Sequence, residues 1–382
     1  MRVALITTDN REHLKKYELD APWLSPPIAA LLEGFQSVEN SAAIQVHVLS
    51  CTQQLMRSPE KLSENVFFHS LLVPKTGWMR TGYQGCIRAV RKKLKEIQPD
   101  IVHGQGTERD CAISAAFSGY PNVVTLHGIM REMARVTRAR PGSFLWLSNL
   151  IEGVALRRAG GVICISNYTR KMVGARCRKT WLVPNALQTP YFTTPLSTAR
   201  PAECTILNLG TICSYKRQNE LLDVLESLHR EGLKFKAQFL GSASRDNAYG
   251  TTFLDRVNNS PYLTYLGFKS VDELIRHLDD ASALVHVSAI ETFGLVVAEA
   301  LSRNLKFIGF NSGGVADIIR DVDMAEGFED QDWTGVKSAL AKWIHSGFPR
   351  PQSAATVMRE RYHPLMVARQ HLDVYQDLLR RS

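Results

Sequence analysis

Short apolar runs alternate with amphipathic segments along the whole chain. Runs such as Val3–Thr7 and Ala283–Val287 are almost continuously apolar, which is typical of strands buried on both faces of a sheet. Between such runs, apolar residues recur at helical spacing, as they do over Gly82–Ile97. This alternation predicts parallel sheets that are covered by helices on both faces.

The pattern predicts strands throughout both halves of the chain. In the first half they are Val3–Thr7, Ile44–Leu49, Val66–Leu72, Ile101–His103, Val123–Leu126, Val162–Ile165 and Trp181–Val183. In the second half they are Thr205–Leu209, Phe235–Leu240, Leu263–Leu266, Ala283–Val287 and Lys306–Gly309. One helix is predicted to begin at Ser25-Pro26, because serine can cap a helix and proline suits its first position.

The chain of 382 residues is long for one domain, and its length favours two. The boundary is predicted after Val183-Pro-Asn-Ala186, where residues 189–201 are rich in proline, threonine and serine. The first domain then comprises residues 1–187, joined by a C-terminal helix within 364–382, and the second comprises 188–363. We expect two doubly wound domains with a cleft between them, and ligands at the carboxyl ends of the strands.

The net charge of +9 is concentrated in the first half of the chain. Residues 1–190 carry 25 Lys and Arg against 14 Asp and Glu, a net of +11, and the remaining residues carry 21 against 23. Basic residues cluster around 88–95 and 131–140. They are interpreted either as solvated helix faces or as a surface that attracts anionic lipid head groups or an anionic acceptor. A nucleic-acid partner is not expected, because no stacking aromatics are interleaved with the basic residues.

The seven cysteines are scattered, without a CxxC pair or the spacing of metal ligands. This usage is typical of free thiols in a reducing compartment. The apolar run near Met1 is too short for the core of a signal peptide. A cytoplasmic protein is therefore expected, with peripheral contact to the inner membrane face as a further possibility.

Two carboxylates, Glu291 and Glu299, lie eight residues apart around a predicted strand-to-helix junction. The apolar run ending at Val287 predicts the strand, and Leu295–Arg303 has helical periodicity, which places Gly294 near the start of the helix. Main-chain N–H groups at such a start favour an anion, and carboxylates accept hydrogen bonds from hydroxyls. The pair therefore predicts a site for a phosphorylated, hydroxyl-rich ligand such as a nucleotide sugar.

The segment from Asn208 to Arg217 follows the first predicted strand of the second domain. Gly210 allows a ligand to approach the main chain, and Lys216 and Arg217 could pair with phosphate oxygens. Taken alone, the segment is also compatible with a surface turn that leads into an ordinary helix. Together with the carboxylate pair, it favours phosphate binding.

Further glycines lie at strand ends of the second domain. Gly241 would keep the sheet edge open to a nucleotide, and the main chain around Phe268 could face a nucleobase. Gly313-Gly314 opens a predicted helix over Val315–Ile319. Each signal is weak by itself, and a plain turn is an equal interpretation. Several such glycines in one domain make a nucleotide-sized cavity more credible.

Two histidines in the first domain stand at predicted strand ends. His103 is weighed mainly as a hydrogen-bonded structural residue and secondarily as an acceptor-side residue. His127 precedes Gly128 and a flexible segment, and it can donate to a sugar hydroxyl or stabilise a developing charge. The Asp-x-Asp pairs at 321/323 and 330/332 could bridge a metal to a diphosphate, but solvated turns are the preferred interpretation.

These residues resemble the family 4 retaining nucleotide-sugar glycosyltransferases, which have the GT-B fold of two Rossmann-like domains. The strongest element is Glu291-Thr-Phe-Gly-Leu-Val-Val-Ala-Glu299, which is similar to the family's E-x7-E motif. Supporting elements are PDIVHGQG from Pro99, TLHG at 125–128, ISNYTR from Ile165, VPNA at 183–186, LGTICSYKR from Leu209 and GGVADII from Gly313. The last helix is similar to the family's helix that crosses back onto the first domain.

The resemblance implies roles for the donor side of the site. Glu291 would lie by the donor sugar and Glu299 would hold the ribose. Lys216 would neutralise the diphosphate leaving group, so that no divalent metal or other cofactor is required. The main-chain amides that would bind sugar hydroxyls and diphosphate belong to Phe293, Gly294 and Leu295.

It also implies roles for residues of the first domain. His127 would contact the donor sugar, and Ser166 would line the cleft. The segment around Trp23 and the loop from Met130 to Gly142 are expected to touch the acceptor.

Three departures from the family pattern bear on the site. Thr211 stands where the family usually has Arg, and Arg217 stands where it usually has Gly and could compensate. Ala186 replaces a glycine at the domain junction, and Asp20–Pro27 replaces an N-terminal Gly-Gly loop, which leaves the acceptor side open. Losing one charged contact to phosphate costs about 2 kcal/mol, or about 30-fold in affinity.

The expected activity is the transfer of a hexose from a nucleoside diphosphate sugar to a hydroxyl acceptor, with retention of the anomeric configuration. A glycan, a glycolipid or a small molecule could be the acceptor. Two alternatives stay open. One is a catalytically weak or silent binding subunit, which Thr211 favours, and the other is a phosphorylase or epimerase on the same fold.

Overall fold

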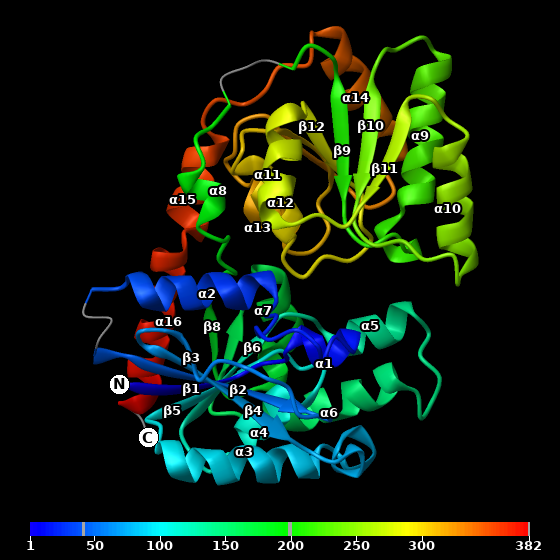
Figure 1. The fold of residues 1–382 in the computed structure, drawn as a ribbon. Helices are drawn as coiled ribbons and strands as arrows, with labels where there is room; N and C mark the ends of the chain where they lie inside the picture. Colours follow the sequence, from blue (N-terminus) through cyan, green and yellow to red (C-terminus); the bar gives the residue numbers. More distant parts are fainter. Residues whose placement is uncertain (40–42, 198–200, 381–382) are drawn as a thin grey trace. The chain divides into compact units, whose positions relative to one another are not determined.

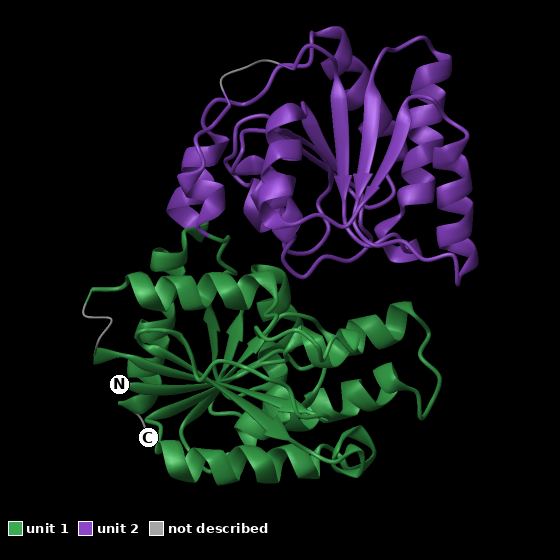
Figure 2. Cartoon of the chain, viewed as in Figure 1, with its two compact units in different colours: residues 1–188, 362–382 green, residues 189–361 purple. Residues whose placement is uncertain are grey.

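The computed structural model describes residues 1–39, 43–197 and 201–380. Residues 198–200 of the predicted linker and 381–382 of the predicted C-terminal segment lie outside the described residues. The chain divides into two compact units (Figure 2). Unit 1 comprises Met1–Gln188 and Tyr362–Ser382, and unit 2 comprises Thr189–Arg361.

Unit 1 is built on a sheet of eight described strands in the order β3-β4-β2-β1-β5-β6-β7-β8. All neighbouring strands are parallel except β3, which is antiparallel to β4 at the edge. The strands are β1 (Arg2–Ile6), β2 (Gln45–Thr52), β3 (Lys61–Ser63), β4 (Val66–Leu72), β5 (Ile101–Gln105), β6 (Asn122–Leu126), β7 (Val162–Cys164) and β8 (Thr180–Leu182).

Helices cover both faces of this sheet (Figure 1). One apolar core lies under α2 and α16, and a second lies under α3, α4 and α6. Proline occupies the first turn of both α2 and α16. A Cβ atom on Gly34 of α2 would lie 2.3 Å from the main-chain oxygen of Pro364, so glycine lets these two helices pack closely. The helices are α1 (Asn10–Leu14), α2 (Pro26–Ser37), α3 (Gln84–Ile97), α4 (Asp110–Ala116), α5 (Met130–Val136), α6 (Phe144–Arg158), α7 (Asn167–Val173) and α16 (Pro364–Leu379).

Unit 2 has a parallel sheet of six described strands in the order β11-β10-β9-β12-β13-β14. The chain order reverses direction between β9 and β12, and ligands bind at such switch points in open α/β sheets. The strands are β9 (Thr205–Leu209), β10 (Lys236–Leu240), β11 (Leu263–Gly267), β12 (Ala283–His286), β13 (Lys306–Phe310) and β14 (Ala325–Phe328).

The helices of unit 2 lie on both faces of its sheet (Figure 1). Its apolar core gathers residues of α9, α10 and α14 against β9, β10, β12 and β13. The helices are α8 (Pro190–Thr193), α9 (Gln218–Arg230), α10 (Ala248–Asn258), α11 (Val271–Asp280), α12 (Leu295–Leu301), α13 (Val315–Ile319), α14 (Trp333–His345) and α15 (Ala354–Tyr362).

The two parallel-sheet units confirm the predicted fold class, and every predicted strand corresponds to an observed one. Two observed strands, β3 and β14, had no prediction. Both are short edge strands whose residues are only partly buried, so they lack the apolar run that marks an interior strand. Within the described part of the chain, no helix has the length and apolar character needed to cross a membrane.

Candidate donor site and neighbouring residues

Lys216, Glu291 and His286 meet at the carboxyl end of the unit 2 sheet. Lys216 ends a 3₁₀ turn (Ser214–Lys216) after β9, and its Nζ lies 2.5 Å from Oε2 of Glu291, in the loop after β12. Nε2 of His286, the last residue of β12, lies 3.2 Å from the same oxygen. The two loops are joined because the main-chain N–H of Ala289 donates to the oxygen of Tyr215 at 2.8 Å. The topology thus brings together a cation and a carboxylate that are far apart in sequence.

The charges of this cluster follow from burial and from its internal contacts. Burial raises the pKa of Glu291, but the Lys216 ammonium and the His286 ring outweigh it and lower the pKa to about 2. Burial lowers the pKa of His286, with Lys216 acting in the same direction and Glu291 opposing it. At neutral pH the carboxylate is therefore ionised and the ring is neutral, so His286 donates from Nε2. The Lys216 and Glu291 side chains each keep 16% of their surface exposed, which leaves them accessible to a ligand.

Two glycines shape the loop that carries Glu291. Gly294 caps α12 with a φ of 99°, a left-handed conformation that favours glycine, and a Cβ there would lie 2.9 Å from Cγ2 of Val315. Gly314 donates its N–H to the main-chain oxygen of Glu291 at 2.8 Å. A Cβ on Gly314 would lie 2.4 Å from the oxygen of Thr292. The Gly313-Gly314 turn therefore packs directly against the Glu291 loop.

Glu299 lies on α12, next to this loop, and is only 6% exposed. Burial raises the pKa of its carboxyl to about 7, and the nearby Tyr191 hydroxyl offsets this rise only in part. No cation lies against it among the ion pairs of the described residues. The two carboxyls of the predicted pair therefore differ: Glu291 is ionised at neutral pH, whereas burial shifts Glu299 toward its protonated form.

The strand ends of β9, β10 and β11 form an edge of bare main chain. Gly210 donates to the oxygen of Leu240 at 2.9 Å, and Gly241 donates to the oxygen of Gly267 at 3.0 Å. A Cβ on Gly241 would lie 2.1 Å from the oxygen of Gly210, so glycine is required there. Phe268 follows β11 and is 69% exposed. That a flat ligand approaches the main chain at this edge stays a prediction from the glycine pattern.

In unit 1, His127 directly follows β6 and lines a small cavity that has both polar and apolar side chains in its wall. Its Nε2 is 2.8 Å from Oε1 of Gln105, and its ring also interacts with Asn185. The cavity has a volume of about 10 Å³, which suffices for one water molecule. Burial, and then the nearby His371, lower the pKa of His127 to about 4, so its ring is neutral at pH 7.

His103 and Ser166 make contacts within unit 1. His103 is fully buried, with Nδ1 2.6 Å from the Tyr375 hydroxyl and Nε2 2.7 Å from Oγ1 of Thr125. Ser166 is also buried and caps α7 in a capping box with Thr169. These contacts support the structural role that we weighed for His103, and they place Ser166 at the start of a helix.

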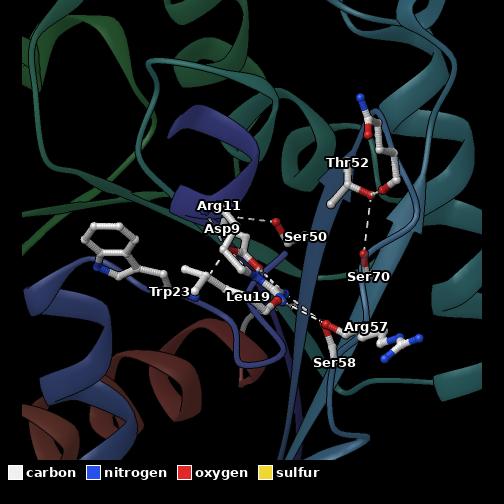
Figure 3. A network of polar contacts seen from close by, with 10 residues as sticks. Asp9, Arg11, Leu19, Trp23, Ser50, Thr52, Arg57, Ser58 and Ser70 are labelled. Carbon is white, nitrogen blue, oxygen red and sulfur yellow. Dashed lines mark hydrogen bonds and ion pairs between the residues drawn. The ribbon is translucent and has the colours of Figure 1, made fainter. Parts of the chain in front are cut away.

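Trp23 belongs to a loop that is held by a buried ion pair (Figure 3). Asp9 accepts hydrogen bonds from the main-chain N–H of Trp23 at 3.2 Å and from Nη2 of Arg11 at 2.7 Å. The fully buried Arg11 also donates to the main-chain oxygens of Leu19 and Arg57 at 2.6 and 2.8 Å. Trp23 of the Asp20–Pro27 segment is thus tied to the start of α1 by a charge-assisted hydrogen bond.

Two family models match consecutive stretches of the chain. The model described as Glycosyltransferase Family 4 matches residues 40–189, and the model described as Glycosyl transferases group 1 matches residues 197–361. The chain belongs to these glycosyltransferases. No curated protein sequence matches the chain.

Solved structures of several glycosyltransferases share the fold over almost the whole chain. Sucrose-phosphate synthase from Thermosynechococcus elongatus has a TM-score of 0.75 at 15% identity, covering 100% of both chains. The lipopolysaccharide outer core galactosyltransferase WaaB has a TM-score of 0.70 at 14% identity, covering 99% of both chains. Anabaena HepE in complex with UDP-glucose has a TM-score of 0.69 at 14% identity, covering 99% of this chain and 100% of HepE. These likenesses show the GT-B fold of two Rossmann-like units.

Thr211 and Arg217, the two positions predicted to depart from the family pattern near Lys216, lie in the segment after β9. Thr211 is exposed, and Arg217 adopts a φ of 60°, which explains why glycine suits its position. The guanidinium of Arg217 pairs with Asp330 through Nη1 and Oδ1 at 2.5 Å. Arg217 therefore contacts the loop after β14, where Asp330 lies in a turn and is half exposed, in agreement with the preferred interpretation.

Sequence reasoning missed two residues of this glycosyltransferase that contact the predicted ones. His286 touches Glu291, and Gln105 touches His127. Both are the last residues of buried strands, β12 and β5. A polar side chain at the carboxyl end of an apolar run is the signal that could have found them.

A further carboxyl of unit 1, that of Glu108, was also not singled out. A Cβ on Gly106 or Gly128 would lie 2.3 or 2.7 Å from one of its oxygens, so two strand-end glycines make room for it. Burial raises the pKa of Glu108 to about 7, and the buried Glu152 adds to the rise.

Proposed function

We propose that this glycosyltransferase moves a hexose from a nucleoside diphosphate sugar to a hydroxyl acceptor, with retention of the anomeric configuration and without a metal ion. The observation that carries the proposal is the cluster of Lys216, ionised Glu291 and neutral His286, with Glu299 on the adjoining helix. It offers a cation for a diphosphate and carboxylates for the hydroxyls of a sugar and a ribose.

Each group of the cluster has a distinct task in this proposal. Lys216 stabilises the negative charge that develops on the departing diphosphate. Glu291 accepts a hydrogen bond from a hydroxyl of the donor sugar, and His286 holds that carboxylate in place. Glu299 accepts hydrogen bonds from the ribose hydroxyls. The transition state is oxocarbenium-like, as in glycosyl transfer generally.

A panel of nucleotide sugars tests the proposal. We expect one nucleoside diphosphate sugar to raise the midpoint of thermal unfolding, because a ligand that binds only the folded state stabilises it. UDP-glucose is the first probe, since HepE has been crystallised with it. Proton NMR of the product with an identified acceptor then reports the anomer. An inverted anomer would disprove retention, and a lack of binding to every UDP, GDP and ADP sugar would disprove the donor class.

A weak or silent binding subunit is the second candidate. The exposed Thr211 and the pairing of Arg217 with Asp330 favour this candidate, because both reduce the positive charge around Lys216. Calorimetry with UDP, GDP and ADP combined with a release assay separates the two candidates. A transferase binds one diphosphate and releases it from its sugar when an acceptor is present, whereas a silent subunit releases none.

Restoring the missing cation is expected to strengthen diphosphate binding. Thr211→Arg should tighten binding of UDP by about tenfold, because it adds one charge-assisted contact to phosphate. Binding of uridine should stay unchanged. Isothermal calorimetry measures both, and Ser214→Arg, which places a cation at another exposed position in the same loop, is the matched control. Equal affinity for UDP in the two variants would contradict a phosphate next to position 211.

We also propose that the basic face of α3 contacts anionic lipid. Arg88, Arg91, Lys92 and Lys95 are exposed along this helix, and each basic residue near an anionic surface contributes about 1 kcal/mol. Binding to vesicles with phosphatidylserine is expected to exceed binding to phosphatidylcholine vesicles and to fall with added salt. Replacing all four residues by Gln should abolish the difference in a sedimentation assay. If the variant sediments like the parent, the basic face is only a solvated surface.

A further inference from the structure

Gln105 joins two histidines at the carboxyl end of the unit 1 sheet. It is the last residue of β5 and is buried, and it lies on the same face of the strand as His103, two residues earlier. Its Oε1 is 2.8 Å from Nε2 of His127. Its Nε2 lies 3.1 and 3.3 Å from the two ring nitrogens of His103. One amide thus faces the candidate catalytic histidine with its oxygen and a structural histidine with its NH₂ group.

His103 is itself held by two hydroxyls from other elements. Tyr375 of α16 contacts its Nδ1, and Thr125 of β6 contacts its Nε2. Both hydroxyls lie within hydrogen-bond distance, and all three side chains are buried. The two hydroxyls therefore hold the His103 ring in a fixed position beside the NH₂ group of Gln105. The C-terminal helix α16 belongs to unit 1 and closes this network from the far end of the chain.

The polarity of the Gln105 contact determines where His127 carries its proton. An amide oxygen can only accept, so a ring nitrogen 2.8 Å away from it must donate. His127 is neutral at pH 7 because burial and His371 lower its pKa, and a neutral imidazole has one N–H group. If that N–H is at Nε2, Nδ1 carries no proton and only accepts hydrogen bonds.

We propose that Gln105 is a positioning residue that fixes His127 as the Nε2–H tautomer. His127 then accepts a hydrogen bond at Nδ1, where a substrate hydroxyl can donate, and it does not act as an acid from that nitrogen. The functional half of this inference rests on the proposed transferase activity. The tautomer itself is a property of the protein alone.

Nitrogen-15 NMR of protein labelled in its histidines tests the tautomer directly. The His127 signals are assigned by their loss in His127→Asn. In the parent we expect the proton on Nε2. In Gln105→Glu we expect the proton to stay on Nε2, because a glutamate side chain has the same length as glutamine and its carboxyl oxygen still accepts the hydrogen bond. In Gln105→Leu we expect a mixture that includes Nδ1–H, because the acceptor is gone.

The control for a general loss of a glutamine is Gln376→Leu, at an exposed position of α16. It should leave the His127 signals unchanged. A proton on Nδ1 in the parent, or an unchanged tautomer in Gln105→Leu, would overturn the proposal. If Gln105→Leu does not fold, the parent and Gln105→Glu spectra still decide where the proton lies.

Kinetics separate this inference from the proposed function. With an active donor and acceptor, Gln105→Leu should lower kcat by about tenfold, the size of effect expected when one hydrogen bond to the transition state is misplaced, with little change in KM. Gln105→Glu should recover most of kcat. A parent with Nε2–H but without transfer activity would refute the proposed function and leave the role of Gln105 intact. Activity with an unchanged kcat in Gln105→Leu would refute only the functional half of the inference.

Discussion

Replacing Lys216 by alanine is expected to lower kcat/KM for the nucleotide sugar by about 100-fold, a typical loss when one charge stabiliser of a transition state is removed. The Lys216 ammonium is the cation paired with Glu291, and the guanidinium of the next residue, Arg217, is paired with Asp330. Binding of the nucleoside diphosphate should weaken, whereas binding of the free nucleoside should not. Steady-state kinetics and calorimetry with UDP and uridine measure the two effects.

The control is Lys342→Ala, which removes an exposed lysine of α14 in the same unit. It should keep the kcat/KM of the parent. The double variant with Glu291→Gln should lose less than the two single losses combined, because residues in contact are not independent. If Lys216→Ala keeps parental activity, the donor phosphate does not lie beside Lys216 and the site is misassigned.

Replacing Glu299 by glutamine is expected to stabilise the ligand-free protein at pH 8 and to weaken nucleotide binding. The folded pKa of about 7 exceeds the ordinary value of 4.5, so the folded state holds its proton more tightly than the unfolded state. The stability that this proton contributes is therefore fully present below pH 4.5 and is lost as the pH rises to about 7. The loss amounts to about 3 kcal/mol. Glutamine cannot ionise and avoids this loss.

Thermal unfolding at pH 5 and pH 8 measures the first effect. The gain of Glu299→Gln over the parent should be larger at pH 8, and Glu360→Gln, at an exposed position on α15, should show no such difference. Calorimetry measures the second effect: affinity for both UDP and uridine should fall about tenfold, because a carboxylate accepts ribose hydroxyls more strongly than an amide. A variant that is more stable and binds equally well would show that Glu299 does not hold the ribose.

The fold follows from local patterns that a reader can find in the sequence. Interior strands such as β9 and β12 are continuous apolar runs because both of their faces are covered, and helices lie between them at the expected spacing. The edge strand β14 escaped prediction because its residues are partly exposed and its run includes Glu326 and Gly327. The predictable part of the fold is therefore the part whose burial is complete.

Part of the candidate site could likewise be predicted from local sequence patterns. Glu291, Gly294 and Glu299 belong to one loop and one helix, so their proximity is a matter of local spacing. The same holds for Gly210 and Gly241, whose positions at strand ends follow from the strands themselves. Residue order alone predicts that these groups gather at the carboxyl edge of one parallel sheet.

Which side chains touch, and with what charge, depends on contacts between distant segments. Lys216 meets Glu291 across 75 residues, Arg217 meets Asp330 across 113, and His103 meets Tyr375 across 272. Strand order and register determine these pairings, and a local sequence pattern predicts neither of them. The protonation of Glu291 and Glu299 differs for the same reason, because a pKa depends on burial and on neighbouring charges. Two glutamates that look equivalent in the chain thus become an ion-paired carboxylate and a buried carboxyl only when the sheet is assembled.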